Sequence, residues 1–390
     1  MQLHFIRQRV LSPIDFFSGK SGDPPMKIAI FHDYFGAAGG GERLVLTLAR
    51  ELDADIITTD VDRRSIHQMG FDDVRVLSLG GVIHVAPFKQ IHASFKFAFS
   101  RHPGYDFYIF SGNWAHYASR RHKPNFWYCH TPVRAFYDLK EYVVKHQKSP
   151  VHRFIARIWI SFHSWFDAES VRRVDRIVTN SENTRRRIAA FYHRAASVVY
   201  PPVDTKKYYH TDETSYWLSV NRLYPEKRIP LQIEVFRRLP GEQLRIVGGY
   251  SQGDHAAKNL GYLAHLPPNV ELLGSVSDEE LIGFYARCKG LVCTAMDEDF
   301  GMTPLEAMAA GKPVVAVQEG GFPESVVDTV TGRLVEATPE GIIGGMREIS
   351  ERGGDYYRDA CCKRAEQFDA PVFVQKIREV IRDVHTGFYS

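Results

Sequence analysis

Short apolar runs alternate along this chain with longer stretches in which apolar side chains recur at the spacing of an amphipathic helix. Alternation of this kind is typical of parallel sheets covered by helices on both faces. The dipeptide Pro201-Pro202 separates two sets of runs. The pattern predicts an α/β fold with two doubly wound, Rossmann-like domains facing a central cleft. Predicted strands occupy residues 27–31, 54–58, 107–110, 125–129, 176–179 and 196–200, and then 216–220, 244–247, 270–273, 291–294, 313–317 and 332–335.

Domain boundaries follow from the same pattern. Residues 26–205 form the first predicted domain and residues 206–371 the second, which suits 390 residues at about 150 residues per domain. Residues 1–25 are expected to be an N-terminal extension, because the stretch before Met26 has the composition of a disordered linker. Met26 is then a candidate for the original start. The N-terminus lacks a long apolar core, so no secretory signal is expected.

Composition excludes several classes of protein. Lys and Arg number 49 against 46 Asp and Glu, and the net charge of +3 is too small to indicate a nucleic-acid partner. No run approaches the roughly 18 apolar residues of a membrane-spanning helix. The five cysteines have no metal-binding spacing, and their odd number favours a reducing cytoplasm.

The segment from Glu298 to Glu306 carries the strongest chemical signal. Its two carboxylates flank a Gly-containing loop that precedes a helix expected to begin at Thr303. With Thr303 as N-cap and Pro304 at the first helical position, Glu306 would close a capping box. Capping does not account for Glu298. The helix N-terminus would also bind an anion such as phosphate, which leaves the carboxylates to accept hydrogen bonds from sugar hydroxyls.

This segment resembles the E-x7-E signature of the retaining GT-B glycosyltransferases of family 4, which are related to glycogen synthase and to bacterial mannosyltransferases. The likeness continues through Gly311-Lys-Pro-Val-Val-Ala and Gly320-Gly321-Phe-Pro-Glu324. The resemblance implies a GT-B fold in which residues 26–205 form the acceptor side and residues 206–371 bind a nucleotide sugar. It also implies that a C-terminal helix within residues 372–390 returns to the N-terminal domain.

A Gly-rich loop at residues 39–43 follows the first predicted strand and opens a helix. Its glycines would let the backbone approach a ligand closely. As a dinucleotide fingerprint the loop is incomplete, since Leu44 occupies the place of the third glycine, although Asp60 lies near the distance of a ribose-binding acid. An NAD-dependent enzyme is therefore the third alternative. The resemblance implies instead a loop beneath the donor diphosphate, with Gly40 as a contact.

Basic residues follow the first predicted strand of the second domain, in the run Asn221-Arg222-Leu-Tyr-Pro-Glu-Lys227-Arg228. Arg222 supplies a planar fork and Lys227 a compact charge, a combination suited to neutralising a diphosphate leaving group. An Arg and a Lys in a loop are ordinarily only solvated. The run resembles the family's G-R-L-x-x-x-K element, which implies a functional role, although Asn221 stands where the family has glycine.

Three further loops after predicted strands are weaker candidates. His130 lies in such a loop, where a histidine is often only a surface residue; the resemblance makes it a partner for a hydroxyl of the reacting sugar. The loop Asn180-Ser-Glu-Asn-Thr is at least as well explained as a helix cap. The run Ser275-Val276-Ser277 resembles the stretch that contacts the nucleobase, mostly through its backbone.

The sequence predicts a site without metal, because Arg222 and Lys227 can replace the charge of a metal ion. Glu298 would hold hydroxyls of the transferred sugar, and Glu306 the nucleotide ribose. No D-x-D motif with supporting context is present, so neither a catalytic metal nor a cofactor is expected beyond the nucleotide sugar itself. The catalytic groups would be His130, Arg222, Lys227 and Glu298, and the donor contacts Gly40, Arg222, Lys227, Ser275, Val276, Glu298, Phe300, Gly301, Met302, Thr303 and Glu306.

The expected function is retaining transfer of a hexose from a nucleotide diphosphate sugar to a glycan or lipid-linked acceptor in polysaccharide assembly. Mannose from GDP-mannose is the first expectation, ahead of UDP-glucose. One alternative is an epimerase or hydrolase that acts on nucleotide sugars with the same fold. Another is a non-catalytic donor-binding partner subunit, against which the presence of Arg222, Lys227, Glu298 and Glu306 argues.

Aromatic and basic residues interleave in residues 88–101 and 151–165. Both segments fit amphipathic helices whose aromatic face would touch a membrane surface or a lipid-linked acceptor. The alternative is that the aromatic side chains pack in the domain core while Lys and Arg extend to solvent. The first interpretation places a cytoplasmic protein peripherally on the inner face of the cell membrane.

Overall fold

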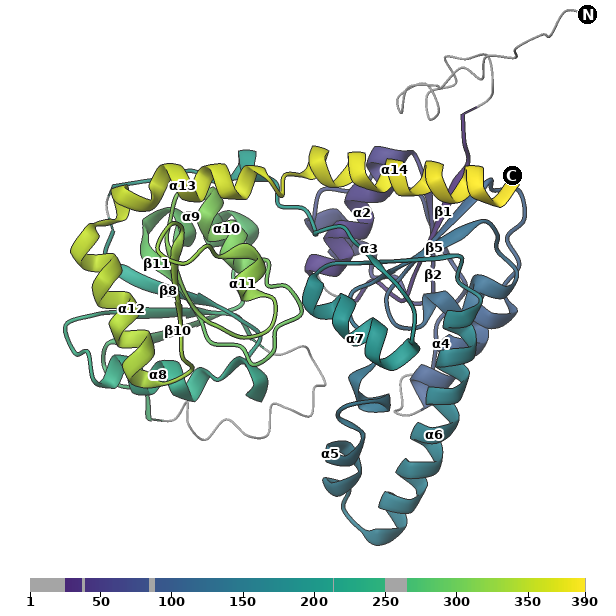
Figure 1. Ribbon diagram of the computed structural model, residues 1–390, viewed down its shortest axis with the longest axis horizontal. Helices are drawn as coiled ribbons and strands as arrows, with labels where there is room; N and C mark the ends of the chain where they lie inside the picture. Colours follow the sequence, from purple (N-terminus) through teal and green to yellow (C-terminus); the bar gives the residue numbers. More distant parts are fainter. Residues whose placement is uncertain (1–24, 37–38, 84–87, 213, 250–264, 390) are drawn as a thin grey trace, which may run out of the picture. The chain divides into compact units, whose positions relative to one another are not determined.

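The computed structural model describes residues 25–36, 39–83, 88–212, 214–249 and 265–389, which belong to two compact units (Figure 1). The first unit contains Met1–Thr179, Arg187–Val199 and Val374–Ser390, and the second contains Asn180–Arg186 and Tyr200–Phe373. Apart from Pro25, the predicted N-terminal extension lies outside the described residues. Each unit is a parallel sheet with helices, as the alternating pattern predicts.

Within the described residues, the first unit contains a seven-stranded parallel sheet in the order β3-β2-β1-β4-β5-β6-β7. The direction of progression reverses between β1 and β4, so the loops after these two strands are neighbours at one edge of the sheet. Strand β3 was not predicted, because three residues are too short to show a pattern. Of the strand predicted at residues 196–200, only two residues pair in the sheet. The strands are β1 (Ile28–His32), β2 (Asp55–Thr58), β3 (Val76–Ser78), β4 (Phe107–Ser111), β5 (Asn125–Cys129), β6 (Arg176–Thr179) and β7 (Ser197–Val198).

The second unit repeats this arrangement, and its described residues form a six-stranded parallel sheet in the order β10-β9-β8-β11-β12-β13. Here the reversal falls between β8 and β11. Strand β11 begins earlier than predicted, because Cys288 and Gly290 pair with Tyr216 and Trp217 of β8. The strands are β8 (Tyr216–Val220), β9 (Leu244–Val247), β10 (Val270–Gly274), β11 (Cys288–Cys293), β12 (Val314–Val317) and β13 (Gly332–Val335).

Helices follow most strands, and the chain passes from the second unit to the first within α14 (Figure 1). In the first unit, Arg378 of α14 donates a hydrogen bond of 2.7 Å to the carbonyl of Glu51 in α2. None of the described helices combines the length and the apolar character that crossing a membrane requires. The helices are α2 (Gly40–Leu52), α3 (Arg63–Gln68), α4 (Phe88–Phe99), α5 (Lys140–Lys145), α6 (Pro150–Arg172), α7 (Glu182–Tyr192), α8 (Ile229–Arg237), α9 (Asp278–Arg287), α10 (Thr303–Ala309), α11 (Phe322–Ser325), α12 (Pro339–Arg352), α13 (Gly354–Glu366) and α14 (Ala370–Tyr389), with short 3-10 turns η1 (Ala115–Arg120), η2 (Arg134–Phe136), η3 (Thr205–Lys207) and η4 (Pro225–Lys227).

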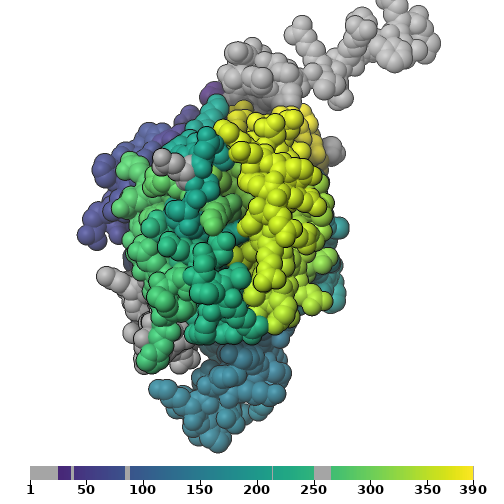
Figure 2. Space-filling view, turned by 90° about the vertical axis from the view of Figure 1, so that its left-hand side faces the viewer, coloured from purple at the N-terminus to yellow at the C-terminus, as the bar shows by residue number. Residues whose placement is uncertain are grey.

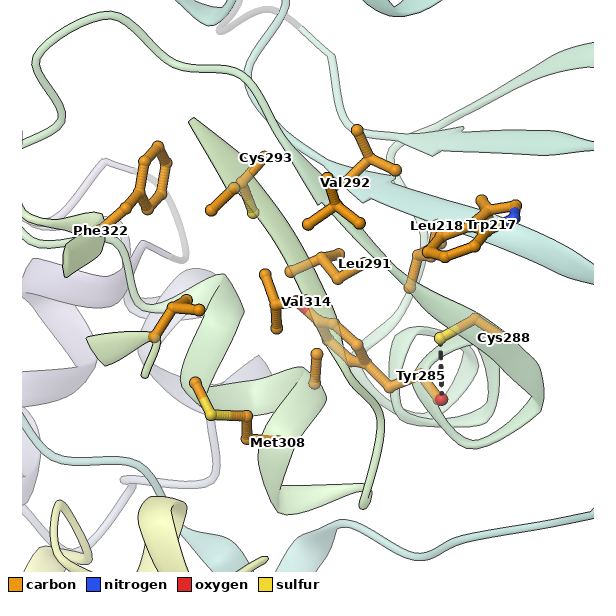
Figure 3. Packing of buried hydrophobic residues seen from close by; sticks show 14 of the residues in the cluster. Trp217, Leu218, Tyr285, Cys288, Leu291, Val292, Cys293, Met308, Val314 and Phe322 are labelled. Atoms are coloured by element: carbon orange, nitrogen blue, oxygen red, sulfur yellow. Dashed lines mark hydrogen bonds between the residues drawn. The ribbon is translucent and has the colours of Figure 1, made fainter. Parts of the chain in front are cut away.

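The core of the second unit packs β8, β11 and β12 against α9 and α10 (Figure 3). Trp217 of β8 is fully buried, and its ring lies so close to Gly290 of β11 that a Cβ there would come within 2.8 Å of it. The indole N–H donates to Glu242 at 3.2 Å, which satisfies the polar atom of the buried ring. Burial raises the pKa of Cys288 and Cys293 to about 12, so these thiols act as small apolar groups.

A buried carboxylate, Asp167 of α6, joins three parts of the first unit. It accepts hydrogen bonds from the hydroxyls of Tyr137 at 2.6 Å and Tyr192 at 2.8 Å, and Nε2 of His116 lies 3.1 Å from its second oxygen. Burial, followed by the charge of Asp167, raises the pKa of both tyrosines, so both hydroxyls remain donors. Asp167 therefore fixes the C-terminal half of α6 against η1, α7 and the residue that follows η2.

We predict that Asp167→Ala lowers the free energy of unfolding by about 2–5 kcal/mol, because it removes the partner of the Tyr137 and Tyr192 hydroxyls and of Nε2 of the buried His116. Urea denaturation of the full chain measures the change. The matched control is Asp138→Ala, which removes a surface partner of Arg134 and should cost less than about 1 kcal/mol. Equal midpoints for the two variants would show that Asp167 does not hold the unit together.

Candidate functional site

An ion pair between Lys227 and Glu298 spans the point where the strand order of the second sheet reverses. Lys227 lies in the loop after β8 and Glu298 in the loop after β11, and these strands are adjacent in the sheet. Nζ of Lys227 donates to Oε2 of Glu298, and the two side chains are 20% and 21% exposed. Ligands of doubly wound sheets bind beyond the carboxyl ends of the strands at such a reversal. The pair therefore stands where a ligand is expected.

The backbone around Lys227 is fixed by the neighbouring loop. The hydroxyl of Thr294 donates to the carbonyl of Lys227 at 2.7 Å, and the Met296 amide donates to the Glu226 carbonyl at 2.7 Å. Arg228 adopts a left-handed conformation with φ of 52° at the start of α8, and its guanidinium donates to Glu319 at 3.0 Å. The loops after β11 and β12 thus hold the short turn that carries Lys227.

Arg222, by contrast, is exposed, and it has no hydrogen-bonded or ion-paired partner among the described residues. It follows β8 directly, at the same edge of the sheet as Lys227. Both predicted cations therefore lie in one loop, but only the side chain of Lys227 is fixed by a partner. The close approach of the loops after β8 and β9 depends on Gly248, since a Cβ there would overlap the carbonyl of Asn221.

The loop that carries Glu298 rests on a pair of glycines. Gly320 has a φ of +59°, and a Cβ on it would overlap the backbone of Glu298. The amide of Gly321 donates to the Glu298 carbonyl at 2.8 Å. Gly301, within the loop, has a φ of +85°. The Gly-Gly pair that supported the sequence resemblance therefore has a mechanical role: it lets the loop after β12 lie directly against Glu298.

Ser181, directly before α7, and the first residues of α7 support the same loop. Asn183 donates to the carbonyl of Glu298 at 3.0 Å, and the hydroxyl of Ser181 donates to the carbonyl of Asp299 at 2.6 Å. Ser181 also accepts from the amide of Thr184 at 2.9 Å, which confirms the capping interpretation of this run. The carboxylate of Glu324 accepts from the amides of Glu182 and Asn183 at 2.6 Å and 2.8 Å. Sequence reasoning missed this support, because the contacts join residues more than 100 positions apart.

Helix α10 begins at Thr303 as predicted, but the predicted capping box is wrong. Met302 occupies the N-cap position with helical φ and ψ of −76° and −34°, and no side chain caps the helix there. Glu306 instead accepts a hydrogen bond of 2.6 Å from the hydroxyl of Tyr285 in α9. Tyr285 is fully buried, and burial raises its pKa well above the usual value, so it remains a donor. With seven residues, α10 has a small dipole, and an anion would depend more on Lys227 than on this helix.

The side chains of the remaining predicted donor contacts differ in their exposure to solvent. Phe300 is buried at 2% exposure and stacks on Tyr200 with ring centroids 5.3 Å apart, so only its backbone could meet a ligand. Ser275 is exposed and Val276 half-buried, directly after β10. Ser277 caps α9 in a capping box with Glu280. Gly301, Met302 and Thr303 are half-buried in the turn that leads into α10.

His130 belongs to the first unit, where it follows β5. Its Nε2 lies 2.9 Å from the hydroxyl of Ser111 at the end of β4, and a Cβ on Gly41 would lie 3.9 Å from its ring. Burial lowers the pKa of His130 to about 4, so the imidazole is neutral at neutral pH. Gly40, the first residue of α2, is exposed beside Gly41. The loops after β1, β4 and β5 therefore bring His130 near the start of α2.

Two further residues at this edge were not singled out from the sequence. Asp33 follows β1, and its carboxylate accepts from the amides of residues 113, 114 and 115 at 2.6, 2.8 and 2.9 Å. Burial raises the pKa of Asp33 to about 6 despite these bonds. Gly112 allows the approach, since a Cβ there would overlap the carboxylate. Burial also lowers the pKa of His32 to about 3. Their positions at the end of a predicted strand were the sequence feature that could have identified His32 and Asp33.

One group of described side chains could hold a metal ion, and it is separate in sequence from the loops discussed so far. Ligand atoms of His210, Asp212 and Asp355 lie within 4.8 Å of one another. Arg358 approaches Asp212 at 4.0 Å, and burial followed by the charge of Lys312 lowers the pKa of His210. Positive charge beside the group makes it a poor cation site.

Two family models match the chain and together cover residues 38–368. The model described as "Glycosyl transferases group 1" matches residues 203–368, and the model described as "Glycosyltransferase Family 4" matches residues 38–207. The chain belongs to the family 4 glycosyltransferases. The first match includes Lys227 and Glu298, and the second includes Gly40 and His130, so the loops built above lie within the family's own sequence pattern.

Similar proteins and similar solved structures are also glycosyltransferases or have the corresponding fold. Alpha-1,3/1,6-mannosyltransferase ALG2 of Mus musculus is 27% identical over 254 residues, or 57% of this chain and 58% of the relative, so the match spans little more than half of that protein. The crystal structure of Anabaena HepE in complex with UDP-glucose has a TM-score of 0.71 at 20% identity and covers 92% of this chain and 100% of HepE. Sucrose-phosphate synthase from Thermosynechococcus elongatus has a TM-score of 0.73 at 17% identity, with 93% and 100% covered. These structures confirm the predicted GT-B fold.

We predict that Gly320→Ala destabilises the second unit by about 2–4 kcal/mol, because the new Cβ meets the Glu298 backbone and the left-handed φ is strained for alanine. The control is Gly344→Ala in α12, where a Cβ meets nothing within 4 Å and helix propensity improves by about 0.5–1 kcal/mol. Urea denaturation gives both values. A Gly320→Ala chain as stable as wild type would mean that the Glu298 loop does not depend on this contact.

The low pKa of His130 predicts a loss of stability in acid. The unfolded chain binds a proton as pH falls through about 6.5, whereas the folded chain does so only near pH 4, so stability falls between these values. His130→Asn should remove roughly 1–2 kcal/mol of the difference in unfolding free energy between pH 7 and pH 5. His67→Asn, at an exposed histidine, is the control for the substitution itself. Identical pH profiles for wild type and His130→Asn would contradict the assignment.

Proposed function

We propose that this chain is a retaining glycosyltransferase that moves a hexose from a nucleotide diphosphate sugar to a glycan or lipid-linked acceptor. The observation that carries the proposal is the ion pair of Lys227 and Glu298 at the reversal of the second sheet, within the segment that matches the group 1 family model. A cation and a carboxylate at this place provide for the phosphate and the hydroxyl groups of one donor.

Stabilisation of the leaving group is the proposed task of Lys227 and Arg222. Glycosyl transfer leaves negative charge on the departing diphosphate, and fixed cations lower the barrier most when they need no rearrangement. Lys227 meets that condition, since its turn is bonded to the loop after β11. Arg222 is exposed and would become ordered on the diphosphate, where its fork can bind two oxygens. No catalytic metal and no further cofactor are proposed, because these cations supply the charge.

Recognition of the donor is assigned to the remaining loops. Glu298 would accept from hydroxyls of the transferred sugar, and Glu306, oriented by Tyr285, from the ribose. The backbone of Ser275 and Val276 would meet the nucleobase. Contacts from the turn before α10 and the start of α2 would complete the set through Phe300, Gly301, Met302, Thr303 and Gly40, with Phe300 limited to its backbone.

His130 is proposed as a hydrogen-bond partner of the reacting sugar rather than as an acid. Its pKa of about 4 keeps the imidazole neutral at neutral pH, and a neutral imidazole can accept or donate one hydrogen bond. Ser111 occupies Nε2 at 2.9 Å and fixes the ring orientation. The structure thus favours a positioning contact with a hydroxyl over delivery of a proton.

Mannose is the proposed sugar, and GDP-mannose the proposed donor ahead of UDP-glucose. The support is the mannosyltransferase name of the relative from Mus musculus at 27% identity. HepE, whose crystal structure contains UDP-glucose, shares 20% identity and therefore supports the fold alone. The proposed setting is polysaccharide assembly in the cytoplasm, at the inner face of the cell membrane.

We predict that Lys227→Ala and Glu298→Ala each reduce donor turnover by at least about tenfold, because each removes one side of the pair. The double variant should lose little more than the worse single variant, since residues that act as one unit are not additive. Turnover is read as release of nucleoside diphosphate from the donor that a thermal-shift panel of nucleotide sugars selects. The matched control is Lys289→Ala, which breaks a comparable ion pair with Glu242 elsewhere in the unit.

Near-normal turnover in both single variants would contradict the site. The same assay, run with and without membrane lipids that supply acceptor, separates the alternatives by product. An epimerase gives an altered nucleotide sugar without acceptor, a hydrolase gives free sugar, and a non-catalytic subunit binds donor without turnover. NMR of the anomeric proton in the transferred product decides retention.

A further inference from the structure

An apolar stripe runs along α6 of the first unit, and no other described part of the chain covers it. Its members recur at intervals of four, three, four and three residues, which places them on one side of a helix. All are between 51% and 65% exposed, and a phenylalanine at 63% widens the stripe. The stripe consists of Val151, Ile155, Ile158, Phe162 and Trp165, together with Phe154.

The opposite side of the same helix is anchored. Ile160, His163 and Asp167 are buried, and Ile160 packs with Phe136 and Val144 in a separate small core. Ser149 caps the helix by accepting from the His152 amide, so the first turn is well defined. The exposed stripe therefore belongs to a helix held firmly on its other face. Helix α5 and the start of α6 project from the first unit (Figure 1), and Figure 2 shows them as an uncovered protrusion.

The apolar stripe continues onto α4 through ring contacts. Phe162 lies 6.3 Å from Phe166, Phe166 lies 6.2 Å from Phe95, and Phe95 stacks on Phe99 at 6.0 Å with ring planes 9° apart. Phe95 and Phe99 are 42% and 66% exposed. The α6 stripe and these two α4 residues form one continuous area, called here the α4–α6 surface. A contiguous exposed apolar area of this kind marks an interaction site.

The segment of chain that carries most of the α6 stripe has charged residues of one sign. Between Tyr142 and Phe166 the chain has four basic residues and neither Asp nor Glu, although the whole chain is nearly balanced at 49 basic and 46 acidic residues. All four basic side chains are exposed: Lys145, Lys148, Arg153 and Arg157. Apolar and aromatic residues flanked by Lys and Arg are the pattern that binds anionic lipid.

We propose that the α4–α6 surface docks onto an anionic lipid membrane. Apolar side chains would enter the boundary between headgroups and acyl chains, while the four cations meet lipid phosphates. A second copy of the chain fits less well, because it would bring the same four cations against each other. The proposal rests on the membrane setting of the proposed function and names the surface that docks, whereas lipid binding itself needs no sugar donor. Within residues 151–165 the sequence alternative of core packing holds for Ile160 but not for Phe154, Phe162 or Trp165. Within residues 88–101 it holds for Phe97 but not for Phe95 or Phe99.

Vesicle flotation of the full chain, without nucleotide, tests the proposal. Vesicles of phosphatidylcholine with about a third phosphatidylglycerol should bind at least about tenfold more protein than pure phosphatidylcholine. The triple variant Phe154→Ser, Ile158→Ser, Phe162→Ser should lose about tenfold or more of that binding. The double variant Lys145→Glu, Lys148→Glu should lose the preference for phosphatidylglycerol.

A matched control changes exposed aromatic residues of the second unit. Tyr209→Ser with Tyr356→Ser removes two side chains that are 50% and 61% exposed and should leave vesicle binding unchanged. Trp165 provides an independent readout, because lipid brominated on its acyl chains should quench its fluorescence, and Trp165→Phe should remove most of the quenching.

Three results would overturn the proposal. One is equal vesicle binding by wild type and the triple variant. Another is equal binding of wild type to vesicles with and without phosphatidylglycerol. The third combines two observations: wild type does not float with vesicles, and without vesicles it sediments as a dimer whereas the triple variant sediments as a monomer. That result would identify a second copy of the chain as the occupant. Thermal melting checks that each variant folds, and a donor-induced shift in melting temperature reports on the second unit separately, so failure of docking and failure of the proposed function are distinguishable.

Discussion

The adjacency of β8 and β11 is the constraint on which the candidate site depends. The two strands are separated in sequence by α8, β9, β10 and α9, yet they exchange hydrogen bonds in the middle of the sheet. Because all strands are parallel, the loops that follow them emerge at the same edge, and the reversal of order leaves no crossover covering that edge between them. Lys227 and Glu298 meet for this reason. Without the reversal, a cation and a carboxylate 71 positions apart would have no cause to pair.

Much of the fold could be predicted from the sequence, because strands buried on both faces appear as continuous apolar runs. The runs at 125–129 and 216–220 coincide with β5 and β8. The start of β11 could not be predicted in this way: Cys288 and Gly290 are paired because Tyr216 and Trp217 lie opposite, which is a property of the neighbouring strand. The three-residue β3 has the same origin, since its pairing with β2 decides its existence.

Some residues of the candidate site could likewise be predicted from the sequence, and others could not. Motif spacing was sufficient to choose Lys227 and Glu298, because strand ends and loop chemistry are local features. It failed for Glu306, where local spacing favoured a capping box and the structure supplies a hydroxyl from Tyr285 on another helix. It also missed Asn183, which supports the Glu298 carbonyl from 115 positions away. For α6 the pattern showed an amphipathic helix, but both of its sides carry apolar residues. Only the burial of Ile160 and Asp167 shows which side faces the unit.

The state of the ion pair before a donor binds has a consequence for catalysis. Lys227 and Glu298 neutralise each other while about four fifths of each side chain is out of solvent, so neither charge is left uncompensated and the loops keep their geometry. A donor that brings a diphosphate to Lys227 and hydroxyls to Glu298 replaces one compensated arrangement with another. The cost of that exchange is small compared with burying a lone charge. With the roles proposed for these residues, charge that develops on the leaving diphosphate would strengthen the attraction to Lys227, while the neutral hydroxyls on Glu298 would change little. The gain would then be greatest in the transition state, which is the condition for raising the rate rather than only the affinity.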